Sequence, residues 1–189
     1  MILPIVAYGD PILKKKAEII TKEYPRLDEV IADMFNTMHN AKGVGLAAPQ
    51  IGLSIRLFVV DGSPFDEKEV KNLKKVFINS RMLKEEGVKW KFNEGCLSIP
   101  GVREDVFRKP EIEIEYEDEN FVKHKGKFKG TSARIIQHEY DHIEGILFPD
   151  RISAMRRQLI RSALLDISRG DVDADYKMRF TPKKSSAVK

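Results

Sequence analysis

Cysteine and long apolar runs are almost absent from this sequence. Cys96 is the one cysteine among 189 residues, so the chain can form no internal disulfide bond. No apolar run approaches the ~20 residues that a membrane-spanning helix needs, and the first four residues (MILP) do not begin a charged stretch followed by an apolar signal core. We therefore expect a soluble cytoplasmic protein with no membrane partner, and at this length one domain with a sizeable core.

Histidine is scarce as well, yet two of the four histidines stand four residues apart with a glutamate between them. In a helix, His138 and His142 would lie on one face, where both imidazoles could reach one metal ion. Glu139 would point about 100° away, close enough to handle the proton of a reacting water. Ordinary helix residues beside a solvated charge run are the alternative. A Ser or Thr cap before the apolar stretch and a glycine after it favour a buried metal-binding helix over residues 131–145.

A catalytic metal site needs a third protein ligand, and the residues after the motif supply few candidates. Phe148 occupies the place of the third histidine in the extended zinc-peptidase pattern, which excludes that class. No glutamate follows Glu144, so only Asp150, Asp166 and the aspartates of the tail remain downstream. We therefore expect the third ligand to lie upstream.

Cys96 is the upstream candidate, within the segment NEGCLSIPG (93–101). A lone cysteine is by default a small buried apolar residue. Gly95 allows close approach of the backbone, and Pro100 and Gly101 predict a turn that ends the segment, so we expect Cys96 on irregular chain that lines a site. A thiolate with two imidazoles suits zinc or ferrous iron.

The glycine-rich segment GVGLAAPQIG (43–52) fits the loose form of a dinucleotide-binding fingerprint. That fingerprint needs a strand before it and a helix after it. Here apolar residues recur at helical spacing over 27–38, before the segment, and a strand pattern follows over 55–61. The order is inverted, which argues against a cofactor site and favours a loop whose Gln50 donates hydrogen bonds to a substrate oxygen.

Together, the segments 43–52, 94–98 (EGCLS) and 137–142 (QHEYDH) make the chain resemble the bacterial peptide deformylases over roughly residues 2–168. The resemblance implies a hydrolase that removes the N-formyl group from the formyl-methionine of nascent polypeptides and releases formate. It also implies one divalent metal ion, natively ferrous iron with zinc or nickel in the isolated protein, held by Cys96, His138 and His142.

The resemblance implies further roles around this centre. Glu139 is the expected general acid and base, and the Gln50 side-chain amide and the Leu97 backbone N–H are the expected donors to the oxyanion. Glu94, fixed by Arg108, would support the ligand loop, although an exposed ion pair is the alternative. Apolar residues of the expected pocket could equally belong to the core. The expected substrate-binding residues are Val44, Gly45, Phe92, Gly95, Arg103, Arg134 and Ile135.

The spacing of apolar residues predicts an α+β fold in which antiparallel strands surround the metal-binding helix and a C-terminal helix follows. We expect helices over 25–40 and 154–168 and a mobile loop over 62–74. One catalytic domain would cover 1–169, followed by a basic tail over 170–189 that is flexible apart from anchoring by Tyr176 and Phe180. The expected strands cover 55–61, 76–79, 88–93, 102–107, 111–117 and 122–128.

The basic charge lies at the C-terminal end, where residues 150–189 hold ten Lys or Arg against five Asp, while residues 1–149 hold 23 against 24 Asp or Glu. We expect a weak, salt-sensitive contact with ribosomal RNA and no DNA partner; a merely solvating tail is the alternative. Two other functions remain open. An endopeptidase would share the metal helix but need a long substrate cleft, and a non-catalytic metal or ribosome-binding module would not need Glu139 and Gln50.

Overall fold

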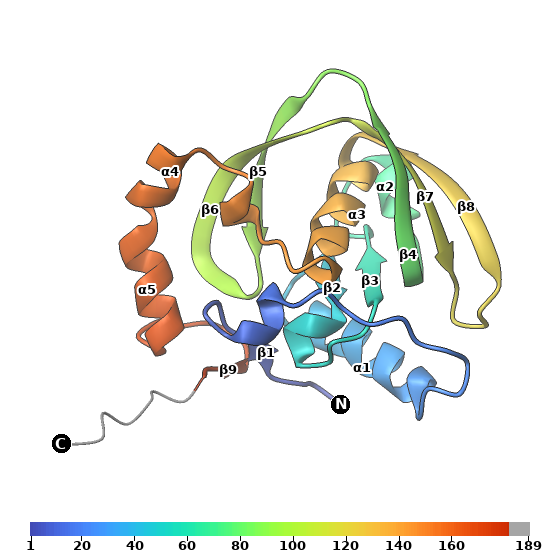
Figure 1. The fold of residues 1–189 in the computed structure, drawn as a ribbon, viewed down its shortest axis with the longest axis horizontal. Coiled ribbons are helices and arrows are strands. Elements are labelled where there is room, and N and C mark those ends of the chain that lie inside the picture. Colours follow the sequence, from blue (N-terminus) through green and yellow to red (C-terminus); the bar gives the residue numbers. More distant parts are fainter. Residues whose placement is uncertain (182–189) are drawn as a thin grey trace.

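The computed structural model describes residues 1–181, and a central helix organises it. Helix α3 (Gly130–Ile143) runs between a five-stranded antiparallel sheet and a separate two-stranded hairpin (Figure 1). The sheet has the strand order β2-β3-β4-β7-β8, and the hairpin pairs β5 with β6. The predicted α+β fold is therefore confirmed. The strands are β2 (Gly45–Ala47), β3 (Leu57–Asp61), β4 (Lys74–Glu86), β5 (Trp90–Cys96), β6 (Ile99–Arg108), β7 (Glu111–Glu117) and β8 (Lys123–Lys129).

The other elements lie around this centre (Figure 1). Short strands β1 and β9 pair in parallel near the two ends of the described chain. The helices besides α3 are α1 (Leu27–Asn40), α2 (Lys68–Lys71), α4 (Ala154–Leu159) and α5 (Arg161–Arg169), with 3-10 turns η1 (Pro11–Lys14), η2 (Ala48–Ile51) and η3 (Phe148–Asp150), and the paired strands are β1 (Ile5–Val6) and β9 (Met178–Arg179).

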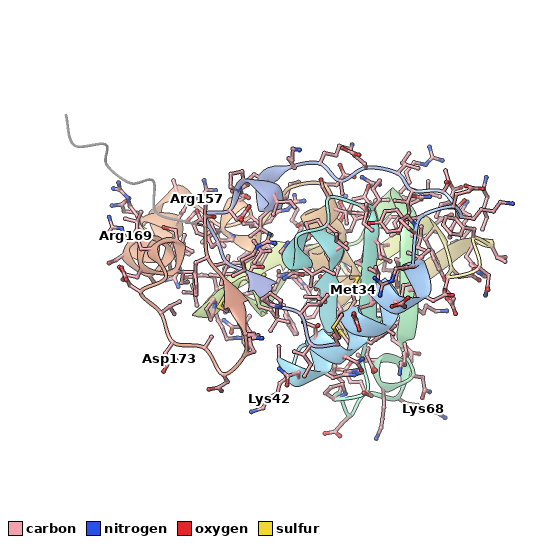
Figure 2. All side chains as sticks on the ribbon, turned by 90° about the horizontal axis from the view of Figure 1, so that it is seen from below. Met34, Lys42, Lys68, Arg157, Arg169 and Asp173 are labelled. Carbon is pink, nitrogen blue, oxygen red and sulfur yellow. The ribbon has the colours of Figure 1, made fainter. Side chains whose placement is uncertain are left out.

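Strand β3 is buried on both faces and so joins two layers of the core. Successive side chains of a strand point to opposite faces. Leu57 and Val59 pack in a cluster with residues of α1, among them the fully buried Met34 (Figure 2). Phe58 and Val60 pack instead in a cluster with the apolar face of α3. This double packing holds α3 against the sheet, while its other side faces the β5–β6 hairpin (Figure 1).

Strand β7 shows the alternation that the sequence predicts. Ile112, Ile114 and Tyr116 are buried against α3 and its neighbours, whereas the glutamates between them are exposed or half-buried. One face of the strand therefore contributes to the core and the other meets solvent, as in a half-buried antiparallel sheet. The predicted bounds of this strand, 111–117, agree with the structure.

Several predicted boundaries are wrong, each for a physical reason. Strand β4 is 13 residues long instead of four, because backbone pairing with β7 extends it through a polar half that carries no alternation signal. The predicted C-terminal helix is two helices, broken at Ile160. Helix α3 begins at Gly130 after Lys129, with no side-chain cap. The predicted turn at Pro100 and Gly101 instead lies within β6, and the hairpin turns at residues 97–98.

Two segments expected to be irregular carry structure. Residues 62–74 include α2, whose Val70 is buried in the cluster around α3. Within the expected tail, β9 pairs with β1, and Phe180, one of the two expected anchors, packs with apolar residues of α5 and β6. The last part of that predicted tail, residues 182–189, lies outside the described residues. Over residues 1–181, no helix has both the length and the apolar character that crossing a bilayer requires.

Candidate metal centre and substrate pocket

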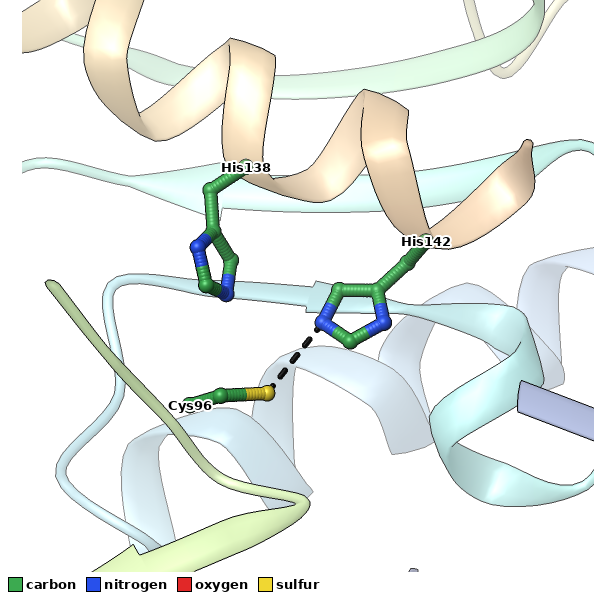
Figure 3. Close-up of side chains that lie close together, drawn as sticks. All are labelled: Cys96, His138 and His142. Atoms are coloured by element: carbon green, nitrogen blue, oxygen red, sulfur yellow. Dashed lines mark hydrogen bonds between the residues drawn. The ribbon is translucent and has the colours of Figure 1, made fainter. Parts of the chain in front are cut away.

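Cys96, His138 and His142 come together where the end of β5 meets α3 (Figure 3). One donor atom from each lies within 4.8 Å of the others, and Cys96 Sγ is 3.2 Å from His142 Nε2. The spacing of four residues places both histidines on one face of α3, as the sequence predicts. Cys96 ends β5 at a shift in the pairing register after Gly95. This donor set fits a zinc or ferrous ion, since catalytic sites use three protein ligands.

The buried surroundings of His142 suit a metal ligand. Burial disfavours the charged imidazolium and, with the nearby charges of His138 and Arg108, lowers the pKa of His142 well below its usual value. The neutral imidazole is the form that binds a metal ion. His142 therefore needs no proton release before it can act as a ligand.

Glu94 supports the metal centre through hydrogen bonds to the side chains around it. Although burial alone would raise its pKa, hydrogen bonds to His138 and Arg108 bring the pKa of Glu94 well below its usual range. Its carboxylate accepts from Arg108 Nε at 2.8 Å, Arg134 at 2.9 Å and His138 Nδ1 at 3.0 Å. Arg108 also donates to Asp141 on α3 at 2.6 Å. The expected pairing of Glu94 with Arg108 is present, and because His138 Nδ1 is engaged, its Nε2 is left to face Cys96.

Gln50 presents its amide nitrogen to the centre. Its Oε1 accepts from the Ala47 backbone N–H at 2.8 Å, which orients the side chain. Its Nε2 then lies 3.6 Å from Cys96 Sγ and 3.3 Å from Ser98 Oγ. The amide donor is thus fixed beside the metal ligands, where it can meet an oxygen of a bound substrate.

Glu139 is buried beside the centre without a partner for one of its oxygens. Its Oε2 has no hydrogen bond within the described chain. Burial raises the pKa of Glu139 to about 7, with the neighbouring His138 acting in the opposite direction. A carboxyl group with a pKa near neutrality can both take and return a proton. Its position and its pKa therefore suit acid-base chemistry.

The glycines of the segment 43–52 leave room for neighbouring side chains and do not serve as a phosphate-binding loop. A Cβ at Gly45 would lie 2.4 Å from Glu139 Oε1, and one at Gly43 would lie 2.7 Å from the Leu97 side chain. Both distances are shorter than a carbon can tolerate. Glycine at these positions therefore lets Glu139 and Leu97 approach the backbone of the loop.

A cavity of about 490 Å³ opens beside the metal-binding residues. Its lining joins α3 with the glycine-rich loop and the β5–β6 hairpin, and it includes every residue that the sequence predicts for the substrate pocket. It also contains Phe65, which sequence reasoning missed, and Tyr176, which was expected from the sequence only as an anchor of the C-terminal tail. An aromatic ring in a polar segment was the available signal for Phe65. The expected residues on the lining are Val44, Gly45, Phe92, Gly95, Arg103, Arg134 and Ile135.

Arg134 lies on the pocket lining, and its charged group is bound within the protein. Its guanidinium is buried, donates to Glu94 and to the carbonyls of Val106 and Trp90 at 2.9, 3.1 and 2.8 Å, and lies over the rings of Trp90 and Phe92. These contacts take up its terminal nitrogens. Arg134 therefore clamps the hairpin to α3 and shapes the pocket wall.

The remaining histidines lie away from the centre, as the sequence predicts. His39 Nε2 is 3.0 Å from Asp61, and His124 Nε2 is 2.7 Å from Asp118 in the β7–β8 hairpin. Neither belongs to the cluster of donor atoms around Cys96. Both histidines form local ion pairs or hydrogen bonds at the surface.

Comparison with known proteins gives one consistent result. The family model described as polypeptide deformylase matches residues 2–158. The peptide deformylase of Christiangramia forsetii is 57% identical over 195 residues, covering 98% of this chain and 100% of that protein, and the one from Flavobacterium psychrophilum is 56% identical over 193 residues, covering 97% and 100%. Among solved structures, the peptide deformylase from Thermus thermophilus is 39% identical with a TM-score of 0.81, covering 90% of this chain and 99% of that one. The Legionella pneumophila enzyme is 36% identical with a TM-score of 0.79, covering 90% and 98%.

Proposed function

The chain belongs to the polypeptide deformylase family, and we propose that it hydrolyses N-formyl-methionyl peptides with a metal ion held by Cys96, His138 and His142. The observation that supports this assignment is the convergence of these donors beside Gln50 and the buried Glu139. Removal of the N-formyl group from nascent polypeptides is the activity of this family. Such a substrate is made by ribosomes, so we propose the cytoplasm as its compartment.

The protein residues divide the work of the reaction. When bound, the ion supplies Lewis-acid chemistry that makes water a nucleophile near neutral pH. Glu139 takes the proton of the attacking water and later returns it to the leaving amine. The Gln50 Nε2–H and the Leu97 backbone N–H donate to the former formyl oxygen as negative charge grows on it. Glu94 keeps His138 in the tautomer that presents Nε2.

The pocket supplies the binding energy that a formyl group is too small to provide. Phe92 and Ile135 give it an apolar wall for the methionine side chain. Arg103 lies across Gly95 and donates to Asn93 at 2.8 Å through Nε and 2.6 Å through one terminal nitrogen. Its other terminal nitrogen is the group we assign to carbonyls of the substrate backbone.

We propose ferrous iron as the native metal, with zinc or nickel replacing it during isolation. A thiolate with two imidazoles accepts all three ions. Both ferrous iron and the Cys96 thiolate are open to oxidation, so activity is expected to fall in air.

Formate release from a formyl-methionyl tripeptide, measured anaerobically, tests the function and the metal together. The iron-loaded protein should release formate faster than the zinc-loaded protein, and neither should cleave casein. Casein cleavage without formate release would replace the proposal by an endopeptidase. Equal rates for the two metal forms would reject iron while leaving the reaction in place.

Substitutions of Glu139 and Gln50 test the assigned roles. Glu139→Ala should keep the metal stoichiometry and slow deformylation by about 10²- to 10⁴-fold, because the proton carrier is lost. Gln50→Ala should lower kcat by about 10²- to 10³-fold if its amide meets the oxyanion. The exposed Glu119→Ala and Gln158→Ala serve as matched controls. A wild-type rate in either site variant would remove that residue from the mechanism.

We also propose a weak ribosome contact through helices α4 and α5. Figure 2 shows Arg157 and Arg169 on the surface of this part of the molecule. Two other arginines are occupied, since Arg156 binds the buried Glu104 and Arg151 binds Asp141. Arg161 and Arg169 are exposed and have no ion pair within residues 1–181. Free arginines on a helical surface suit the phosphates of ribosomal RNA.

Removing positive charge from α5 distinguishes a ribosome contact from basic residues that only interact with solvent. Arg161→Gln with Arg169→Gln should reduce co-sedimentation with ribosomes at low salt, because fewer phosphates are neutralised. Turnover of a free formyl-methionyl peptide should not change. Lys89→Gln with Lys123→Gln removes the same charge from exposed positions outside α4 and α5. If the two double variants co-sediment equally with ribosomes, the contact is not made by α5.

A further inference from the structure

The turn between β5 and β6 is held by three segments that are distant in sequence. The Leu97 carbonyl accepts a hydrogen bond from the Tyr176 hydroxyl at 2.8 Å. The Ser98 carbonyl accepts one from the Tyr8 backbone N–H at 2.8 Å, and Ser98 Oγ is 3.3 Å from Gln50 Nε2. The turn that follows the metal ligand is therefore fixed from both ends of the chain and from the glycine-rich loop.

Tyr176 is itself fixed by the strand that follows it. Ile5 N–H donates to the Lys177 carbonyl at 2.8 Å, and Ala7 N–H donates to the Arg179 carbonyl at 2.9 Å. Phe180 packs in the same apolar cluster as Cys96, which anchors the segment beyond Tyr176. The aromatic side chain of Tyr176 lines the same cavity as Cys96 and Leu97.

We propose that Tyr176 is a positioning residue of the deformylation reaction, acting through its hydrogen bond to the Leu97 carbonyl. This inference rests on the proposed function. The Leu97 carbonyl belongs to the peptide unit next to the one that carries the Leu97 N–H. Holding this carbonyl restricts the backbone rotations that aim the N–H at the oxyanion and the Cys96 thiolate at the metal. The segment 171–181 is thus part of the catalytic unit, in contrast to the expected boundary at residue 169.

A positioning role predicts an effect on the chemical step in particular. Donors to an oxyanion act through their alignment with charge that develops in the transition state. Loss of one neutral hydrogen bond that maintains this alignment should lower kcat by about threefold to tenfold. The pocket walls that bind the methionine side chain do not depend on the hydroxyl, so KM should stay near the wild-type value.

Tyr176→Phe removes the hydroxyl and keeps the ring, and Tyr24→Phe is the matched control because the Tyr24 hydroxyl makes no hydrogen bond in the described part of the chain. We expect Tyr176→Phe to lower kcat with unchanged KM on a formyl-methionyl tripeptide. When both proteins are loaded with cobalt(II), the absorption band for charge transfer between the Cys96 sulfur and the metal should differ between Tyr176→Phe and the wild type. Tyr24→Phe should match the wild type in both measurements.

A wild-type kcat and a wild-type cobalt band in Tyr176→Phe would overturn the proposal. A rise in KM alone would overturn it as well, since Tyr176 would then act as a substrate contact. If Tyr176→Phe and Tyr24→Phe lose kcat equally, the effect comes from removing any tyrosine hydroxyl, and the proposal is overturned. If the wild-type protein releases no formate, the proposed function fails, and the cobalt band still reports on the turn.

Discussion

The buried carboxylate of Glu94 is the group on which the geometry of this site depends. Transfer of an ionised carboxylate from water into a protein interior costs several kcal/mol unless partners compensate. Here two arginines and a histidine surround it, from β6 and α3. A carboxylate on β5 therefore specifies how the hairpin sits against the helix, which is the relation that brings Cys96 to His138 and His142. Asp141 extends the same network through Arg108 toward Arg151 at the surface.

The two buried carboxyl groups of the site differ in their ionisation because their surroundings differ. Glu94 and Glu139 are both buried carboxyl groups, but Glu94 has cationic partners that keep it ionised, while Glu139 Oε2 has none and its pKa rises to about 7. One carboxyl group is thus suited to holding structure and the other to exchanging protons. Gly45 makes this possible by leaving space for Glu139 beside the loop. The same fold element, α3, carries both a metal ligand pair and the proton carrier.

Much of this arrangement could be predicted from the sequence because it rests on short-range patterns. Helical spacing placed His138 and His142 on one face, and alternation in 111–117 marked β7 with its correct bounds. The motifs of the family pointed to Cys96 and Gln50. What could not be predicted depends on contacts between distant segments. The hydrogen bond from Tyr176 to Leu97 spans 79 residues, and the contacts of Arg134 with β5 and β6 form only on folding.

The central claim is that Glu94 organises the metal centre, and the metal dissociation constant of Glu94→Gln tests it most directly. Glu104→Gln is the matched comparison, because Glu104 is also a buried carboxylate bound by an arginine but makes no hydrogen bond to His138. The account predicts that Glu94→Gln weakens metal binding by about 10- to 100-fold, the range for groups that orient a ligand histidine, while Glu104→Gln binds metal as the wild type does. Equal metal affinities for the two variants would contradict the account.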